Sequence, residues 1–168
     1  SLTTLAEQCL QAAIDEHQTR LEEKHGIPRG ADGSPQRLFV IALGKFGGGE
    51  LNLSSDIDII FCYPQSGTCD GRRGLANDMF FTRLARAVIA SLSELTEDGF
   101  CFRVDTRLRP FGDSGPLTSS LAALEQYYQR EGRDWERYAL IKARPVAGDL
   151  GAGARFIDDV RPFVYRRY

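Results

Sequence analysis

The chain has 168 residues, of which 42% are hydrophobic and 26% charged, and its formal net charge is −2. This length and balance are typical of one folded globular domain with its own core. The small negative charge provides no bulk basic field for a nucleic-acid backbone, so no nucleic-acid partner is expected. No apolar run approaches the roughly 20 residues that a membrane-spanning helix needs, so no membrane is expected either.

The cysteines and the chain ends give two further expectations. Cys9, Cys62, Cys69 and Cys101 form no Cys-x-x-Cys pair and have no histidine nearby in sequence. This pattern predicts reduced thiols in a cytoplasmic protein and argues against zinc. The chain lacks an initiator methionine and ends without an obvious stop, so we expect a piece of a longer protein.

The first half of the chain predicts one helix and two strands. A capping box from Thr4 to Glu7 opens a helix over about residues 4–25, and residues 29–36 form a loop. Apolar runs of strand length follow at residues 38–43 and 56–63. Residues 64–74 are rich in turn-forming residues and predict a mobile loop.

The second half predicts three helices and one strand. Helical spacing runs from residue 77 until Gly99, and residues 100–105 alternate as a strand. Ser119 and Ser120 cap a third helix, and a fourth spans residues 134–144, ended by Pro145. Among the other side chains, Trp135 and Tyr138 are expected in the core, and His17 and His25 on the surface.

The sum is a sheet of at least three strands covered by helices, an α/β or α+β domain. We take residues 1–168 as a single domain, with its sheet and helices at about residues 37–147.

Two aspartates mark the second strand. Asp56 and Asp58 are two residues apart and therefore point to the same face. Each carboxylate resists ionisation beside the other, unless a cation lies between them or water reaches both. Asp105 ends the later strand, and three carboxylates meet if the two strands are neighbours. Three carboxylates suit two Mg²⁺ ions that bridge a phosphate, whereas a solvated strand end is the alternative reading.

The glycine-rich turn at residues 44–49 precedes these aspartates. Such turns present backbone N–H groups to phosphate oxygens. It is not a Walker A loop, because Phe46 follows Lys45 where Ser or Thr would bind Mg²⁺. Both Gly44-Lys45 and Gly47-Gly48 are candidates for the phosphate contact.

Other polar residues around the carboxylates have two readings each. Arg107 and Arg109 carry planar guanidinium groups that suit phosphate oxygens. Arg103 shares a strand face with Asp105 and either pairs with it or contacts phosphate. Ser55 bonds either the backbone or a nucleotide.

A glycine turn, then Asp-x-Asp on the next strand, then a distant third aspartate resembles the layout of the nucleotidyltransferase superfamily. More specifically, the chain resembles the glutamine synthetase adenylyltransferase family over about residues 39–147. The matching segments are Ala42-Leu43-Gly44-Lys45-Phe46-Gly47-Gly48, Glu50-Leu51-Asn52, Ser54-Ser55-Asp56-Ile57-Asp58, Arg103-Val104-Asp105 and Arg107-Leu108-Arg109-Pro110.

The resemblance implies an α+β nucleotidyltransferase (DNA polymerase β-like) fold, a small mixed sheet flanked by helices. It implies that Asp56, Asp58 and Asp105 are catalytic and bind Mg²⁺, with two ions expected. The implied phosphate and nucleotide contacts are Gly44, Lys45, Gly47, Gly48, Ser55, Arg107 and Arg109.

Three segments are similar to the N-terminal, adenylyl-removing half of that bifunctional enzyme. They are Asn52-Leu53-Ser54-Ser55, Arg109-Pro110-Phe111-Gly112-Asp113-Ser114-Gly115-Pro116-Leu117 and Gly132-Arg133-Asp134-Trp135-Glu136-Arg137-Tyr138. The implied reaction is deadenylylation of glutamine synthetase, in which phosphate attacks adenylyl-tyrosine and releases ADP, regulating nitrogen assimilation. Implied partners are glutamine synthetase, ADP or ATP, phosphate and, through the full-length enzyme, a PII-type signal protein. Adenylylation from ATP and nucleotide binding without turnover stay open as alternatives.

Overall fold

The computed structural model describes residues 1–94, 99 and 102–165. Its helices are α1 Leu2–His25, α2 Gly44–Gly47, α3 Asn77–Ser93, α4 Leu121–Arg130, α5 Asp134–Ile141 and α6 Leu150–Val164, with a 3-10 turn η1 at Gly112–Ser114. Its strands are β1 Pro28–Gly30, β2 Phe39–Ala42, β3 Ile57–Tyr63, β4 Gly67–Cys69, β5 Val104–Asp105, β6 Thr118–Ser120 and β7 Arg144–Gly148.

The main sheet is mixed. Its order is β5-β3-β2-β7, and β6 also pairs with β3. Strand β2 runs antiparallel to both β3 and β7, whereas β5 and β6 run parallel to β3 at its two ends. The predicted sheet of at least three strands and its α+β class are therefore confirmed.

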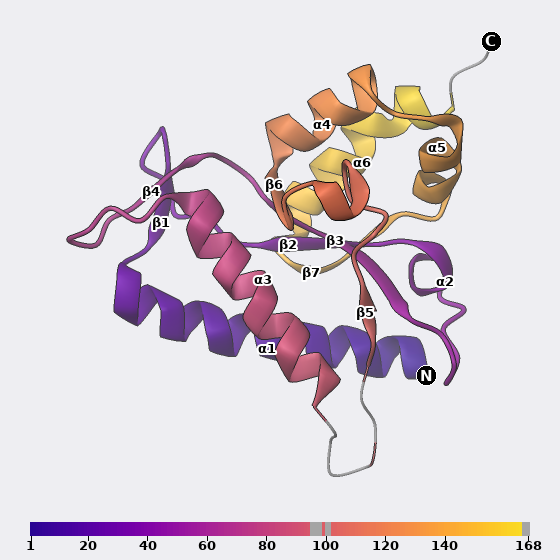
Figure 1. Cartoon of the computed structure of the whole chain (residues 1–168), viewed down its shortest axis with the longest axis horizontal. Helices are drawn as coiled ribbons and strands as arrows, with labels where there is room; N and C mark the ends of the chain where they lie inside the picture. The colour runs from indigo at the N-terminus through magenta and orange to yellow at the C-terminus, as the bar shows by residue number, and fades with distance from the viewer. Residues whose placement is uncertain (95–98, 100–101, 166–168) are drawn as a thin grey trace.

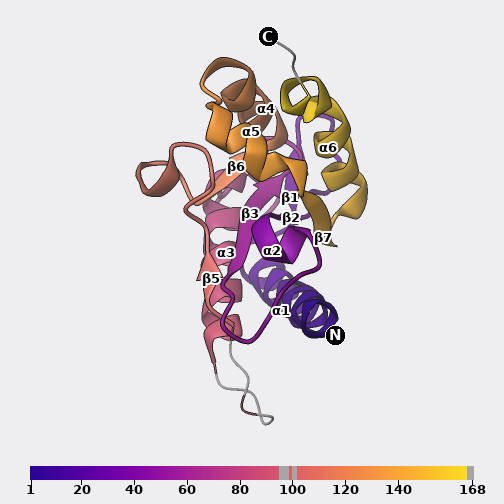
Figure 2. The ribbon, with the colours of Figure 1, turned by 90° about the vertical axis from the view of Figure 1, so that its right-hand side faces the viewer.

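Helices cover both faces of this sheet, with α1 and α3 on one face and α4, α5 and α6 on the other (Figures 1 and 2). Alternate residues of β2 divide between the two cores: Val40 packs on the side of α1 and α3, and Ile41 packs on the side of α4 and α6. Because both faces of β2 and β3 are buried, their sequences are continuous apolar runs rather than alternating ones.

The segment at residues 64–74 is more regular than predicted. Strand β4 pairs antiparallel with β1, which itself lies partly in the predicted loop at residues 29–36. The Asp70 carboxylate accepts hydrogen bonds from Ile27 N–H at 2.8 Å and from Arg29 Nε at 2.9 Å. These contacts tie the segment to the end of α1, so the predicted loop contains a short strand, and its mobility stays a prediction.

Helix boundaries also differ from the predictions. Helix α1 begins at Leu2, because Ser1 Oγ accepts a hydrogen bond from Thr4 N–H at 3.2 Å and Ser1 is the N-cap. The expected helix at residues 134–144 ends at Ile141, and Pro145 lies in edge strand β7, where its missing N–H is tolerated. Ser120 caps α4 as predicted, accepting from Ala123 N–H at 3.2 Å.

Two further differences concern the ends of elements. Helix α3 ends at Ser93, and the first residues of the predicted strand at 100–105 lie outside the described part of the chain. Helix α6, which the sequence analysis did not predict, buries Phe156 and Val160 in the second core. Within the described residues, no helix has the length and apolar character needed to cross a membrane.

Three side-chain predictions are wrong. His17 is buried and lies 2.6 Å from Ser91 Oγ, which packs α1 against α3. Trp135 and Tyr138 are 47% and 66% exposed, because α5 turns Glu136 and Leu140 inward instead.

Candidate functional site

Strands β3 and β5 place two carboxylates of the site side by side. Strands β3 and β5 pair in parallel, with Ile57 opposite Val104 and Asp58 opposite Asp105. Ile57 N–H donates to the Arg103 carbonyl at 2.8 Å and fixes this register. Side chains opposite each other in a sheet point to the same face, so Asp58 and Asp105 are neighbours.

Asp58 carries an electrostatic cost in this position. Its partial burial, followed by the nearby charges of Asp105 and Asp56, raises its pKa from 3.8 to about 6, and Arg107 opposes the rise. Burial and like charges both disfavour the ionised carboxylate. The repulsion predicted between Asp56 and Asp58 therefore contributes to this rise, and Asp105 contributes more.

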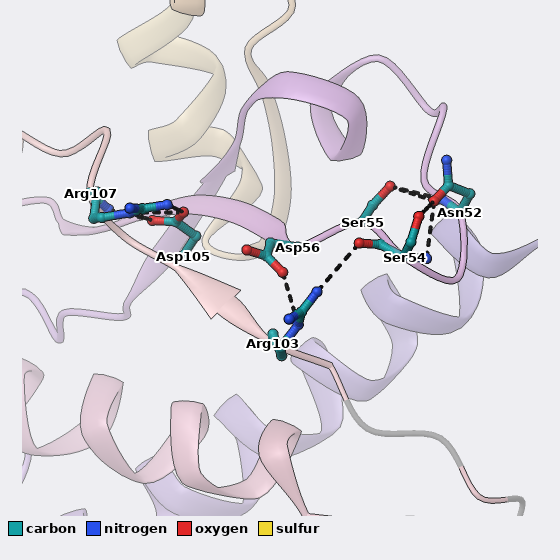
Figure 3. Close-up of polar contacts among 7 residues, drawn as sticks. All are labelled: Asn52, Ser54, Ser55, Asp56, Arg103, Asp105 and Arg107. Atoms are coloured by element: carbon teal, nitrogen blue, oxygen red, sulfur yellow. Dashed lines mark hydrogen bonds and ion pairs between the residues drawn. The ribbon is translucent and has the colours of Figure 1, made fainter.

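Arg107 neutralises Asp105 (Figure 3). Its guanidinium donates through Nη2 to Oδ2 at 2.7 Å and through Nε to both carboxylate oxygens at 3.1 Å. Arg107 N–H also donates to Asp105 Oδ1 at 2.9 Å. These bonds hold the pKa of Asp105 below its ordinary value. The Arg107 side chain is itself 70% exposed, so solvent reaches the outer side of this ion pair.

Arg103 pairs with Asp56, not with Asp105 as one sequence reading had it. Its Nε lies 3.0 Å from Asp56 Oδ1, and its Nη2 donates to the Ser54 carbonyl at 3.4 Å (Figure 3). Asp56 Oδ1 is buried and lacks a hydrogen bond of good geometry, so the contact with Arg103 is an ion pair by distance only. The register between β5 and β3 explains why Arg103 pairs with Asp56 instead of Asp105, because it brings Arg103 beside Asp56, just before β3 begins.

The glycines of the turn divide into two kinds. A Cβ atom at Gly44 would lie 2.8 Å from Asp58 Oδ2, and Gly44 has φ +55°. A Cβ atom at Gly47 would lie 2.3 Å from the Lys142 carbonyl oxygen. Gly44 therefore lets the backbone approach the carboxylate, whereas the absent side chain at Gly47 serves packing against the end of α5.

The other residues of the turn lie at its surface. Lys45 and Gly48 are exposed, and the first N–H groups of α2 have no partners within that short helix. Arg144, which was predicted to end the helix at residues 134–144, begins β7 and donates to the Phe46 carbonyl at 3.1 Å and to the Gly47 carbonyl at 3.2 Å. Its position just before a proline gave no signal of this contact, since the pairing of β7 with β2 creates it.

Ser55 has a structural partner. Its Oγ donates to Asn52 Oδ1 at 2.9 Å, and Asn52 N–H donates back to Ser55 Oγ at 3.2 Å. Ser54 Oγ donates to the same Asn52 oxygen at 2.8 Å. Of its two readings, the backbone-turn reading matches this geometry (Figure 3).

Arg109 also has structural partners. Its guanidinium donates to the carbonyls of Thr106 at 3.1 Å, Gly115 at 3.3 Å and Pro116 at 3.2 Å. Its side chain is only 11% exposed. These bonds close the loop between β5 and β6, so the structure gives Arg109 a loop-organising position rather than a free guanidinium.

The carboxylates suit Mg²⁺ by donor type, since Mg²⁺ prefers hard oxygen ligands on rigid elements. Burial, followed by the charges of Asp105 and Asp56, raises the pKa of Asp58, and a bound cation would offset that rise. In the described residues, however, no three acidic, histidine or cysteine side chains are arranged as a ready metal cage. Two of the three aspartates instead have arginine partners, since Arg107 pairs with Asp105 and Arg103 pairs with Asp56.

The fold and site together define a mixed α+β domain with an aspartate cluster at one sheet edge, beside a glycine-initiated helical turn. Comparison with known proteins identifies the family. A family model described as glutamate-ammonia ligase adenylyltransferase matches residues 1–158, so the chain belongs to that family.

Individual relatives agree with this assignment. The chain is 54% identical over 166 residues to the bifunctional glutamine synthetase adenylyltransferase/adenylyl-removing enzyme of Stenotrophomonas maltophilia (strain K279a), covering 99% of this chain and 18% of that protein. It is 56% identical over 169 residues to the enzyme of the same name from Pseudomonas aeruginosa (strain PAO1), covering 99% of this chain and 17% of that protein. The chain thus spans less than a fifth of the length of these curated relatives.

Proposed function

We propose that this chain is a metal-dependent nucleotidyl transfer domain of the DNA polymerase β-like type, acting on glutamine synthetase by deadenylylation. The observation that carries the proposal is the register of β3 and β5, which puts Asp58 opposite Asp105 with Asp56 two residues away. The names of its relatives support adenylyl chemistry on glutamine synthetase.

In this proposal, Asp56, Asp58 and Asp105 bind Mg²⁺, which supplies charge neutralisation for the reacting phosphate when bound. The missing Cβ atom of Gly44 leaves room for the Asp58 carboxylate. In the proposed complex the turn contacts the phosphate through Gly44, Lys45 and Gly48. Arg107 is exposed enough to turn from Asp105 to a phosphate oxygen once that carboxylate has another cation. Gly47, Ser55 and Arg109 support the site through packing and turn structure.

The proposed reaction needs no protein nucleophile. An oxygen of inorganic phosphate attacks the α-phosphorus of the adenylyl group, and the bond from that phosphorus to the tyrosine oxygen breaks. The new P–O–P bond makes ADP, and the proton of the hydrogen phosphate ends on the tyrosine oxygen. The chain's residues orient the two phosphates in line and stabilise charge on the transferring group.

The choice of deadenylylation over adenylylation rests on the sequence segments at residues 52–55, 109–117 and 132–138. The cytoplasmic location, the PII-type partner and the single-domain boundary stay predictions that accompany this proposal.

The test compares two reactions with the same chain. One mixture contains adenylylated glutamine synthetase, phosphate and Mg²⁺, and the other contains unmodified glutamine synthetase, ATP and Mg²⁺. We expect ADP from the first mixture and no adenylylated product from the second. Asp58→Asn should abolish the ADP, whereas Asp158→Asn, which removes a surface carboxylate that pairs with Arg161, should leave it unchanged.

Two outcomes would refute the proposal in different ways. Adenylylation in the second mixture with none of the first reaction would assign the reverse activity. ATP binding in the second mixture, with no product in either mixture, would assign a regulatory domain.

A further inference from the structure

A cavity of about 400 Å³ opens beside the aspartate cluster, on the side of α4 and α5. Arg107, which contacts Asp105, also lines this cavity, so the two features share one side chain. The loop after β5 contributes Phe111, and α4 and α5 contribute Tyr127 and Trp135. These three rings come from separate segments, so no short sequence spacing joins them.

Two of the three rings have about half of their surface exposed to solvent. Phe111 is 58% exposed and Trp135 is 47% exposed. Phe111 also has φ +62°, a left-handed conformation that is an outlier for a bulky side chain and that tends to occur at functional sites. The Phe111 ring stands edge-on to Tyr127, with centroids 4.7 Å apart.

The floor of the cavity is fixed by hydrogen bonds. Tyr127 Oη donates to buried Glu136, and Arg133 N–H donates to Glu136 Oε2 at 2.9 Å. These bonds satisfy Glu136 and hold α5 against α4. They therefore position Trp135 on α5, and Phe111 packs against the Tyr127 ring of α4, so both exposed rings are supported by packed side chains.

We propose that this cavity binds the purine base of the adenylyl group by contact with Phe111 and Trp135. Its role in the transfer reaction rests on the proposed function, but base binding itself does not. The volume lies within the roughly 300–1,000 Å³ typical of small-ligand sites. Base–aromatic contacts tolerate different bases, because every base has a π-face. Arg107 would join the two parts of the ligand, near the base on one side and near the phosphate on the other.

The chain contains one tryptophan, which makes the test direct. Adenosine, which carries no phosphate, is titrated into the chain in EDTA while the fluorescence of Trp135 is measured. We expect saturable quenching, and we expect Phe111→Asn to weaken adenosine binding roughly tenfold. Asparagine tolerates the left-handed conformation, so this variant removes the ring without adding backbone strain.

Tyr138→Ala is the matched control. Tyr138 is an exposed aromatic residue of α5, the helix that carries Trp135, and it does not line the cavity. This variant should bind adenosine like the unchanged chain. Circular dichroism melting of each variant separates loss of binding from loss of fold.

The outcomes are distinct from those of the proposed function, because neither metal nor turnover is involved. Absence of quenching, or equal binding by Phe111→Asn and the unchanged chain, overturns the base site even if ADP is formed from adenylylated glutamine synthetase. Quenching by N-acetyltyrosinamide but not by adenosine also overturns it, and assigns the cavity to an aromatic side chain. Saturable adenosine quenching that depends on Phe111 supports the site even if no turnover occurs.

Discussion

Replacing Asp58 by asparagine should stabilise the metal-free protein while it abolishes turnover. The pKa of Asp58 is raised from 3.8 to about 6, first by burial and then by Asp105 and Asp56. A folded-state pKa above the unfolded value means that the native protein binds more protons in this range. Stability is therefore lost as the pH rises from about 4 to about 6, and the full penalty is present above that window.

The size of the penalty follows from the pKa. A rise from 3.8 to about 6 corresponds to about 3 kcal/mol at ~1.4 kcal/mol for each pH unit. Solvent reaches Asp58, so screening reduces this upper limit to about 1 kcal/mol. For a chain of this length, about 1 kcal/mol shifts the melting temperature by roughly 2–4 °C.

The assay is thermal unfolding of Asp58→Asn and of the unchanged chain in EDTA, at about pH 7.5 and about pH 4. We expect a higher melting temperature for the variant at the higher pH and no difference at the lower pH. Asp113→Asn, which changes a carboxylate that is 78% exposed, should match the unchanged chain at both. A lower melting temperature for Asp58→Asn at about pH 7.5 would refute the reasoning and make Asp58 a structural residue.

Three further predictions concern residues outside the reacting centre. Burial, followed by Asp159, raises the pKa of Glu125 from 4.5 to about 7. The melting temperature should therefore fall as the pH rises through that range, and Glu125→Gln should remove this pH dependence. Gly47→Ala should lower the free energy of unfolding in urea by about 1–3 kcal/mol, because its Cβ would lie 2.3 Å from the Lys142 carbonyl oxygen. Arg109→Lys should speed hydrogen exchange in the loop at residues 106–116, since lysine cannot reach three carbonyls at once; unchanged exchange would contradict the loop-organising position.

Strands β2 and β3 could be predicted from the sequence because their burial on both faces leaves continuous apolar runs. Helix α6 could have been predicted as well, since Asp149 caps it and its apolar residues recur at helical spacing. Two glycines and Pro162 within it lower its intrinsic propensity, and packing on the second core outweighs them. The exposure of Trp135 could not be predicted, because it depends on Glu136 finding a buried partner in Tyr127.

The same limit applies to the site. Strand periodicity predicts that Asp56 and Asp58 point to the same face of the sheet. The partners of Arg103 and Arg107, in contrast, depend on the register between β3 and β5. That register joins residues almost fifty positions apart, and nothing local in either segment sets it. The cavity lined by Phe111 and Trp135 depends in the same way on how α5 packs against α4.

The most direct test of the central claim is a crystal structure of the chain grown with Mn²⁺ and ADP, measured at a wavelength where manganese scatters anomalously. Mn²⁺ takes the same oxygen ligands as Mg²⁺ and is visible by its anomalous signal. The account predicts manganese peaks bonded to Asp58 and Asp105, with Arg107 moved from Asp105 toward a phosphate oxygen. ADP bound without manganese at these carboxylates, or manganese bound only elsewhere, would contradict it.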